Sequence, residues 1–128
     1  MPWFLSLLLL SGVLIGGVQA KEVRRTVDGK AGQDARIGLF GSITPDCKPE
    51  RTPPVRIVQP PTHGTIIVGA GQTQVPASGG SCAGSAFPVL AIFYRPAADF
   101  AGEDTTILEF DSGLPEKQVQ IVDVIIRR

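Results

Sequence analysis

The stretch Lys117–Arg127, KQVQIVDVIIR, shows the residue preference that sets the fold class. Six of its eleven residues are Val or Ile, and branching at Cβ restricts a side chain in a helix but suits a pleated strand. The same preference continues outward: after Ala20 the chain has ten Val, ten Ile and eight Thr, against four Leu and no Met. Twelve Gly and ten Pro interrupt these 108 residues, and no stretch of twelve without them has helical apolar spacing. The chain is therefore predicted to be all-β.

Within Lys117–Arg127 the apolar alternation changes phase. Val119 and Ile121 share one face of a strand, whereas Val122, Val124 and Ile126 share the other. A β-bulge near Ile121–Val122 would explain the change, and so would burial on both faces. The pattern leaves both explanations open.

Further strands are predicted between the Gly and Pro residues, where short β-branched runs alternate with polar residues. The seven predicted strands are Glu22–Asp28, Arg36–Phe40, Val55–Gln59, Thr65–Val68, Pro88–Tyr94, Thr105–Phe110 and Lys117–Arg127. A short Gln72–Val75 segment is expected to pair with Thr65–Val68 across a Gly69-Ala70-Gly71 hairpin turn. Seven strands in 108 residues predict one two-sheet β-sandwich, with a small closed β-barrel as the alternative.

The first twenty residues are uncharged and largely apolar, and they end in Val18-Gln19-Ala20, a small-residue pattern that suits signal peptidase. A retained membrane anchor would need about 20 apolar residues. Here the run is broken by Ser11, Gly12, Gly16, Gly17 and Gln19. Residues 1–20 are therefore predicted to be a signal peptide, and residues 21–128 an exported domain, periplasmic or secreted, with no membrane span after cleavage.

Both cysteines, Cys47 and Cys82, lie in the exported part, where an even count predicts a disulfide. A two-cysteine metal site is a weaker alternative, because the chain has one His and no CxxC motif. The bond would join two long connections, the proline-rich Gly41–Pro54 and the small-residue Val75–Phe87. Long ordered loops often carry binding surfaces. The candidate binding loop consists of Ser78, Gly79, Gly80, Ser81, Ala83 and Gly84.

Three motifs in the second half occur in a familiar order: PTHGTI at Pro61–Ile66, FYRP at Phe93–Pro96 and FAGED at Phe100–Asp104, before the closing Val-rich strand. Over Pro60–Arg128 the chain resembles bacterial cadherin-like and Ig-like repeat domains. The resemblance implies a Greek-key β-sandwich with a role in adhesion, surface assembly or partner binding.

Each motif residue also has a scaffold interpretation. Gly64 is expected to adopt a positive φ and His63 to bond to backbone. Tyr94 is expected to send its hydroxyl to a main-chain carbonyl. Pro96 would end its strand, Phe100 would cover the core edge, Gly102 would make a turn and Asp104 would accept backbone N–H groups.

Many of the repeats bind calcium between units through Asp and Asn clusters, but this chain has no Asn. Calcium takes six to eight oxygen ligands, so we predict no metal site. The acids available for one are Asp46, Asp99, Glu103, Asp104 and Asp111.

The sequence offers little material for catalysis. His63 is the sole histidine, and no G-x-S-x-G elbow or phosphate-binding loop with its lysine occurs. Twelve basic and twelve acidic residues give no net charge, which argues against nucleic acid as a partner. We therefore predict a protein that is not an enzyme and needs no cofactor; an enzyme using His63 is a remote third hypothesis.

The expected function is a structural, adhesion or partner-binding role in the cell envelope, with a protein or polysaccharide as the partner. The alternative is a secreted or periplasmic hydrolase inhibitor that presents the Val75–Phe87 loop to an active site.

Overall fold

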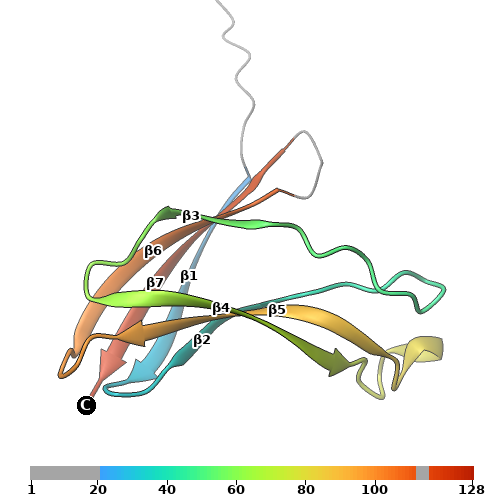
Figure 1. Cartoon of the computed structure of the whole chain (residues 1–128), viewed down its shortest axis with the longest axis horizontal. Coiled ribbons are helices and arrows are strands. Elements are labelled where there is room, and N and C mark those ends of the chain that lie inside the picture. The colour runs from blue at the N-terminus through green and yellow to red at the C-terminus, as the bar shows by residue number, and fades with distance from the viewer. Residues whose placement is uncertain (1–20, 112–115) are drawn as a thin grey trace, which may run out of the picture.

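The computed structural model describes residues 21–111 and 116–128, and nearly all of the regular structure in them is β (Figure 1). The predicted signal peptide, residues 1–20, lies outside the described residues. The strands are β1 (Lys21–Lys30), β2 (Ala35–Phe40), β3 (Val55–Gln59), β4 (Gly64–Gln74), β5 (Ala86–Pro96), β6 (Gly102–Phe110) and β7 (Gln118–Arg127), with one 3-10 turn, η1 (Gly80–Cys82), before β5. Nowhere in these two ranges is there a helix long and apolar enough to cross a membrane.

The strands form two sheets, one in the order β1-β7-β6-β3 and the other in the order β2-β5-β4. The predicted seven-strand sandwich is confirmed, and the closed barrel is wrong. Only β4–β5 and β6–β7 are hairpins of one sheet; every other connection carries the chain to the opposite sheet. All pairings are antiparallel except that of β1 with β7.

The core lies between the two sheets and consists mainly of β-branched and aromatic side chains from the long inner strands. Each such side chain contributes about 1.5–3 kcal/mol when fully buried, which is the main favourable term for the fold. Phe40 of the small sheet meets Phe110 of the large one with ring centroids 4.2 Å apart. The buried members of the core are Ile37, Ile92, Tyr94, Leu108, Phe110, Val122, Val124 and Ile126.

Strand β7 runs without a register shift against both of its neighbours. Of the two explanations for the phase change, the bulge near Ile121–Val122 is therefore excluded, and burial on both faces accounts for it. The inward residues are Gln120, Val122, Val124 and Ile126, and the outward residues Val119, Ile121 and Ile125 are still partly covered.

The predicted hairpin turn at Gly69-Ala70-Gly71 is also wrong. Strand β4 passes straight through these residues, with Gly69 opposite Ala91 and Gly71 opposite Val89. Glycine permits a turn but does not require one. Here β5 offers an uninterrupted partner of equal length, so the ladder continues to Gln74.

Candidate functional site

The motif residues meet at one end of the sandwich, around the carboxylate of Asp104. This side chain is 6% exposed and accepts four hydrogen bonds. Its donors are the Thr62 and His63 amides at 3.0 and 2.7 Å, the Tyr94 hydroxyl at 2.8 Å and its neighbour Thr105's amide at 2.9 Å. Asp104 thus holds the segment before β4 against β5 and β6.

The pKa values of Tyr94 and Asp104, which share a hydrogen bond, shift in opposite directions. Burial alone raises the pKa of Asp104, but the hydrogen bonds from Thr62, Tyr94, His63 and Thr105 outweigh burial and leave that pKa below its usual range. Burial, together with the adjacent Asp104 carboxylate, raises the pKa of the Tyr94 phenol. At neutral pH, Asp104 is therefore an acceptor and Tyr94 a donor.

Two expectations for this cluster need correction. The Tyr94 hydroxyl bonds to the Asp104 carboxylate and not to a main-chain carbonyl, because Asp104 brings a stronger, charged acceptor into the same buried space. Gly64 does not have a positive φ. It is needed for close approach, since a Cβ there would lie 2.5 Å from two atoms of the Tyr94 ring.

The remaining motif residues close the same end. The His63 ring stacks on Phe100 with centroids 4.5 Å apart, and the His63 carbonyl accepts the Ala97 amide at 2.8 Å. Pro96 is buried at the end of β5, and Gly102 has a φ of 142° that suits glycine. The motifs therefore build a packed scaffold around Asp104.

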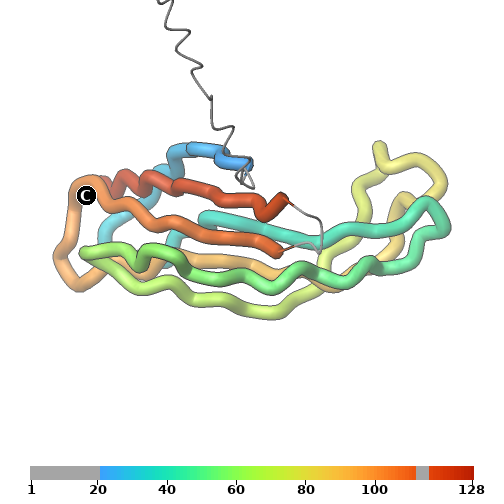
Figure 2. The backbone as a smooth tube through the Cα atoms, turned by 90° about the horizontal axis from the view of Figure 1, so that it is seen from above, coloured from blue at the N-terminus to red at the C-terminus, as the bar shows by residue number. Residues whose placement is uncertain are grey.

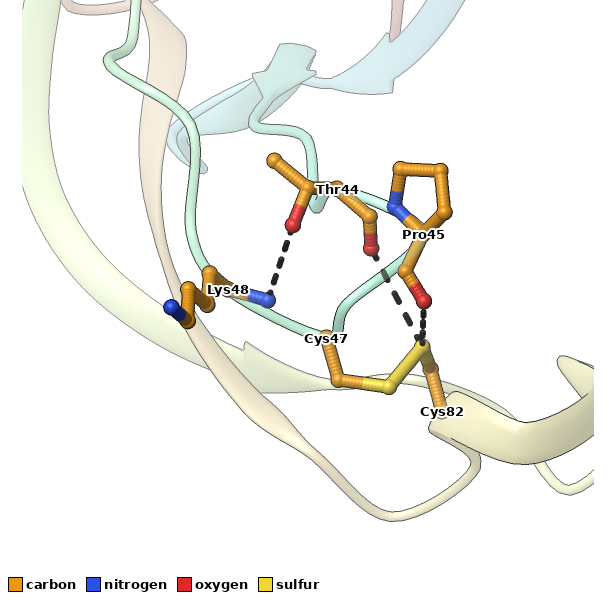
Figure 3. Close-up of a disulfide and its surroundings, with 5 residues drawn as sticks. All are labelled: Thr44, Pro45, Cys47, Lys48 and Cys82. Carbon is orange, nitrogen blue, oxygen red and sulfur yellow. Dashed lines mark hydrogen bonds between the residues drawn. A yellow bond between two sulfur atoms is a disulfide. The ribbon is translucent and has the colours of Figure 1, made fainter.

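The opposite end of the molecule carries the predicted disulfide, which the structure confirms (Figure 3). The Cα atoms of Cys47 and Cys82 are 5.3 Å apart, and main-chain oxygens of Thr44 and Pro45 lie 4.0 and 3.7 Å from Cys82 Sγ. The Lys48 amide bonds to Thr44 Oγ1 at 3.1 Å, which folds this loop back on itself. The bond joins the connection before β3 to the one before β5.

The candidate binding loop lies beside this disulfide and is almost wholly exposed. It forms compact turns: the Gly79 amide bonds to Pro76, the Ala83 amide to Gly80 and the Gly84 amide to Val75. Cys82 is its one buried side chain. The exposed members are Ser78, Gly79, Gly80, Ser81, Ala83 and Gly84.

The acids considered for calcium do not form a site in the two described ranges. No group of three or more His, Cys, Asp or Glu side chains there could hold a metal ion. The four hydrogen bonds to Asp104 come from the protein itself, and Glu103 points to solvent on the other face of β6. The acids concerned are Asp46, Asp99, Glu103, Asp104 and Asp111.

The outer face of the four-stranded sheet carries ion pairs as well as the half-buried Val119, Ile121 and Ile125 of β7. Arg24 of β1 pairs with Asp123 of β7 at 2.8 Å, and Asp123 also accepts the Thr105 hydroxyl at 2.8 Å. Glu109 of β6 lies 3.2 Å from Arg56 and 3.6 Å from Lys117. Isolated exposed pairs of this kind stabilise a fold little, but they keep the surface hydrated.

The outer face of the three-stranded sheet is apolar in its centre. Register places Ile67 of β4 beside Phe93 of β5, and Leu39 of β2 beside Ala91. They face outward, because their neighbours Ile66, Ile92 and Phe40 pack in the core. Leu39 is 44% exposed. We define the outer apolar face as Leu39, Ile67, Gly69, Ala91 and Phe93.

Basic residues flank this face. Exposed Arg36 lies opposite Phe93, and Arg95 forms a two-pronged ion pair with Asp34 at 2.8 and 2.9 Å. Sequence reasoning missed the outer apolar face. The signal was available in Pro88–Tyr94, where residues of both parities are apolar, as expected for a strand with two apolar faces.

An open hollow also lies between the Gly41–Pro54 connection and the end of β6. In its wall the Ser42 hydroxyl bonds to Glu50 at 3.1 Å. Its lining residues are Ser42, Glu50, Arg51, Thr52, Pro53, Pro54 and Asp111. The outer apolar face, in contrast, lies on paired strands of a regular sheet. An apolar patch with a charged rim is typical of protein interfaces.

Comparisons with protein-family models, curated proteins and solved structures gave no match. The resemblance to cadherin-like and Ig-like repeats therefore stays a prediction.

Proposed function

We propose that this chain is a non-catalytic, exported module of the cell envelope that binds a protein partner through the outer apolar face. The observation that carries the proposal is the apolar centre of the small sheet's outer face. There Leu39 is exposed, Ile67 and Phe93 are half-buried, and exposed Arg36 lies beside them.

The composition of this face suits a protein interface better than a glycan site. Burial of apolar surface drives most protein association, and aromatic and Arg residues are enriched at such interfaces. Phe93 and Leu39 would supply the apolar centre, and Arg36 would lie at the rim. A charged substitution in the centre should therefore abolish binding.

Two further features support the remaining parts of the proposal. The Cys47–Cys82 bond fits an oxidising compartment and thus export. The His63 ring stacks on Phe100, and the Asp104 carboxylate is engaged by four donors, so both act as scaffold groups.

The experiment is affinity capture from envelope extracts with matched charge substitutions. Leu39→Asp alters the outer apolar face, and Val58→Asp places the same charge at an apolar residue of β3 that is equally exposed, at 44%. We expect loss of the captured protein with Leu39→Asp and unchanged capture with Val58→Asp. Equal capture by both variants, or retention of polysaccharide alone, contradicts the proposal.

A hydrolase inhibitor is the second candidate function, favoured by the exposed loop beside the disulfide. Replacing Ser78 and Ser81 together by Glu would change the loop surface without touching the sandwich core. Inhibition of a captured hydrolase that is lost with this variant, but kept with Leu39→Asp, would replace the first proposal by the second.

A further inference from the structure

Edge strands expose unpaired N–H and C=O groups, and proteins usually protect them with charges, bulges, prolines or short length. The two sheets have four edges, formed by β1, β2, β3 and β4. Three of these edges are protected in one of the usual ways. The fourth is not, and that difference carries an inference about association.

The edges formed by β2, β3 and β1 each carry one of these protective features. Strand β2 has a register shift between Arg36 and Gly38, and β3 has one between Ile57 and Gln59. Strand β3 is also only five residues long, with Pro53-Pro54 before it and Pro60-Pro61 after it. Strand β1 carries six charged residues: Lys21, Glu22, Arg24, Arg25, Asp28 and Lys30.

Strand β4 has none of these devices. Its eleven residues, GTIIVGAGQTQ, contain no charge and no proline, and they pair with β5 without a register shift. Among the described strands, β5 is its only sheet neighbour. In the part of the chain that the structure describes, no other backbone segment bonds along the 65–74 edge.

The edge is also accessible. Figure 2 shows β4 along one long side of the molecule, with no described segment beyond it. Val68 is 46% exposed, and an added Cβ at Gly69 would meet no atom within 4 Å. Three consecutive residues of the strand, Ala70 to Gln72, are all exposed.

We propose that β4 pairs in antiparallel fashion with β4 of a second copy of this chain. The two copies would be related by a two-fold axis perpendicular to the small sheet, and the result would be one continuous six-stranded sheet. Such an interface uses the same surface on both partners, as closed dimers do.

The absence of charge on β4 favours a second copy over an unrelated strand. A two-fold axis sets each strand against itself, so any charge near the axis would face a like charge, and like charges across a strand pair are destabilising. Strand β4 has no charged residue, so no such repulsion would arise between two copies of it. The chain as a whole has no net charge, so long-range repulsion between copies is also small.

The geometry also connects the two surfaces. An axis perpendicular to the sheet keeps the outer apolar faces of both copies on one side, where Ile67 and Gly69 of each copy approach the axis. Pairing would widen the apolar surface without covering it. The inference holds independently of the proposed partner, because the dimer needs no other molecule.

The test is sedimentation velocity over a concentration series, on the oxidised chain from Lys21 onward, which contains every strand of the sandwich. We expect a reversible monomer–dimer equilibrium. The variant Ala70→Lys/Gln72→Lys adds two charges to β4, and the control Thr26→Lys/Gln59→Lys adds the same two charges to exposed positions on β1 and β3. The β4 variant should weaken the dimer at least about tenfold, and the control should leave it intact.

A mixing experiment separates blocked pairing from damaged folding. The acidic variant Ala70→Glu/Gln72→Glu should also be monomeric, and an equimolar mixture of the Lys and Glu variants should restore the dimer. The proposal is overturned if the unaltered chain stays monomeric at all concentrations, which is the result expected were β4 to serve a different protein. It is also overturned if the β4 variant and the control dissociate alike, or if mixing restores nothing.

Discussion

The two ends of the sandwich are held together by different chemistry. At one end, Asp104 joins three segments through hydrogen bonds inside the core. At the other end, the β4–β5 hairpin and η1 extend away from the four-stranded sheet, and a covalent bond ties them to the connection before β3 (Figure 1).

The difference follows from burial. Around Asp104 the chain contributes Tyr94 and Val124, which are fully buried, so hydrogen bonds form where water does not compete. Around the disulfide most residues from Pro76 to Ala86 are exposed. A segment that buries so little apolar surface gains little free energy from packing, and a cross-link compensates for that.

The largest effect is expected from removal of the disulfide. Cys47→Ala/Cys82→Ala should lower the free energy of unfolding by about 4 kcal/mol, because the 35-residue loop is no longer closed in the unfolded chain. Urea unfolding measures the loss, and hydrogen exchange shows where the folded protein loosens. We expect faster exchange at Val75 and Gly84 before the Thr62 and His63 amides change. Equally faster exchange at both ends would show that the disulfide does not act mainly on its own end of the sandwich.

Asp104→Ala should cost about 3 kcal/mol, because the Tyr94 hydroxyl and the Thr62 and His63 amides lose their acceptor in a buried place. Glu103→Ala, at the exposed adjacent position, is the control and should stay within about 0.5 kcal/mol. Thermal and chemical unfolding under oxidising conditions give both values. Similar losses for the two variants would show that the cluster is not what holds this end.

A smaller effect is expected at Gly64. Gly64→Ala would bring a Cβ to 2.5 Å from the Tyr94 ring and 2.6 Å from the Arg95 carbonyl oxygen, which should destabilise the fold by about 1–3 kcal/mol. Gly69→Ala, in the same strand, meets no atom within 4 Å and should change stability by less than about 0.5 kcal/mol. Melting temperatures of the pair test the close approach directly, and equal values would refute it.

Acid should weaken the Asp104 end. The pKa of Asp104 is lower in the folded chain than in the unfolded one, so its stabilising contribution is complete above the unfolded value near 4 and is lost as pH falls through the folded value. The slope of unfolding free energy against pH below about 4 should therefore be shallower in Asp104→Asn than in the unaltered protein. An identical slope would assign the acid sensitivity to other carboxylates.

Much of the fold could be predicted from residue types alone. Cβ-branched residues between Gly and Pro located six of the seven strands closely, and the count of cysteines gave the disulfide. The exception was β4, because Gly69-Ala70-Gly71 has turn composition, and only the presence of an equally long β5 opposite makes it a straight strand. Pairing partners far apart in sequence leave no local signal.

The same limit applies to the sites. That Asp104 accepts backbone N–H groups was predictable from its place at a strand start, but the Tyr94 bond depends on how β5 lies over β6. The outer apolar face was hidden because Leu39, Ile67 and Phe93 each look like ordinary core residues in their own strands. Only the register of β2, β5 and β4 shows that they gather on the side facing solvent.

The parallel pairing of β1 with β7 has a mechanical consequence. Lys21 lies opposite Gln118 and Lys30 opposite Arg127. The first residue of β1 and the last residue of β7 are therefore at opposite ends of the sheet. Tension applied between Lys21 and Arg127 would slide these two strands lengthwise past each other. All of the hydrogen bonds between these ten paired residues would then bear the load together. A hairpin pulled apart from its open end instead loses its hydrogen bonds one after another.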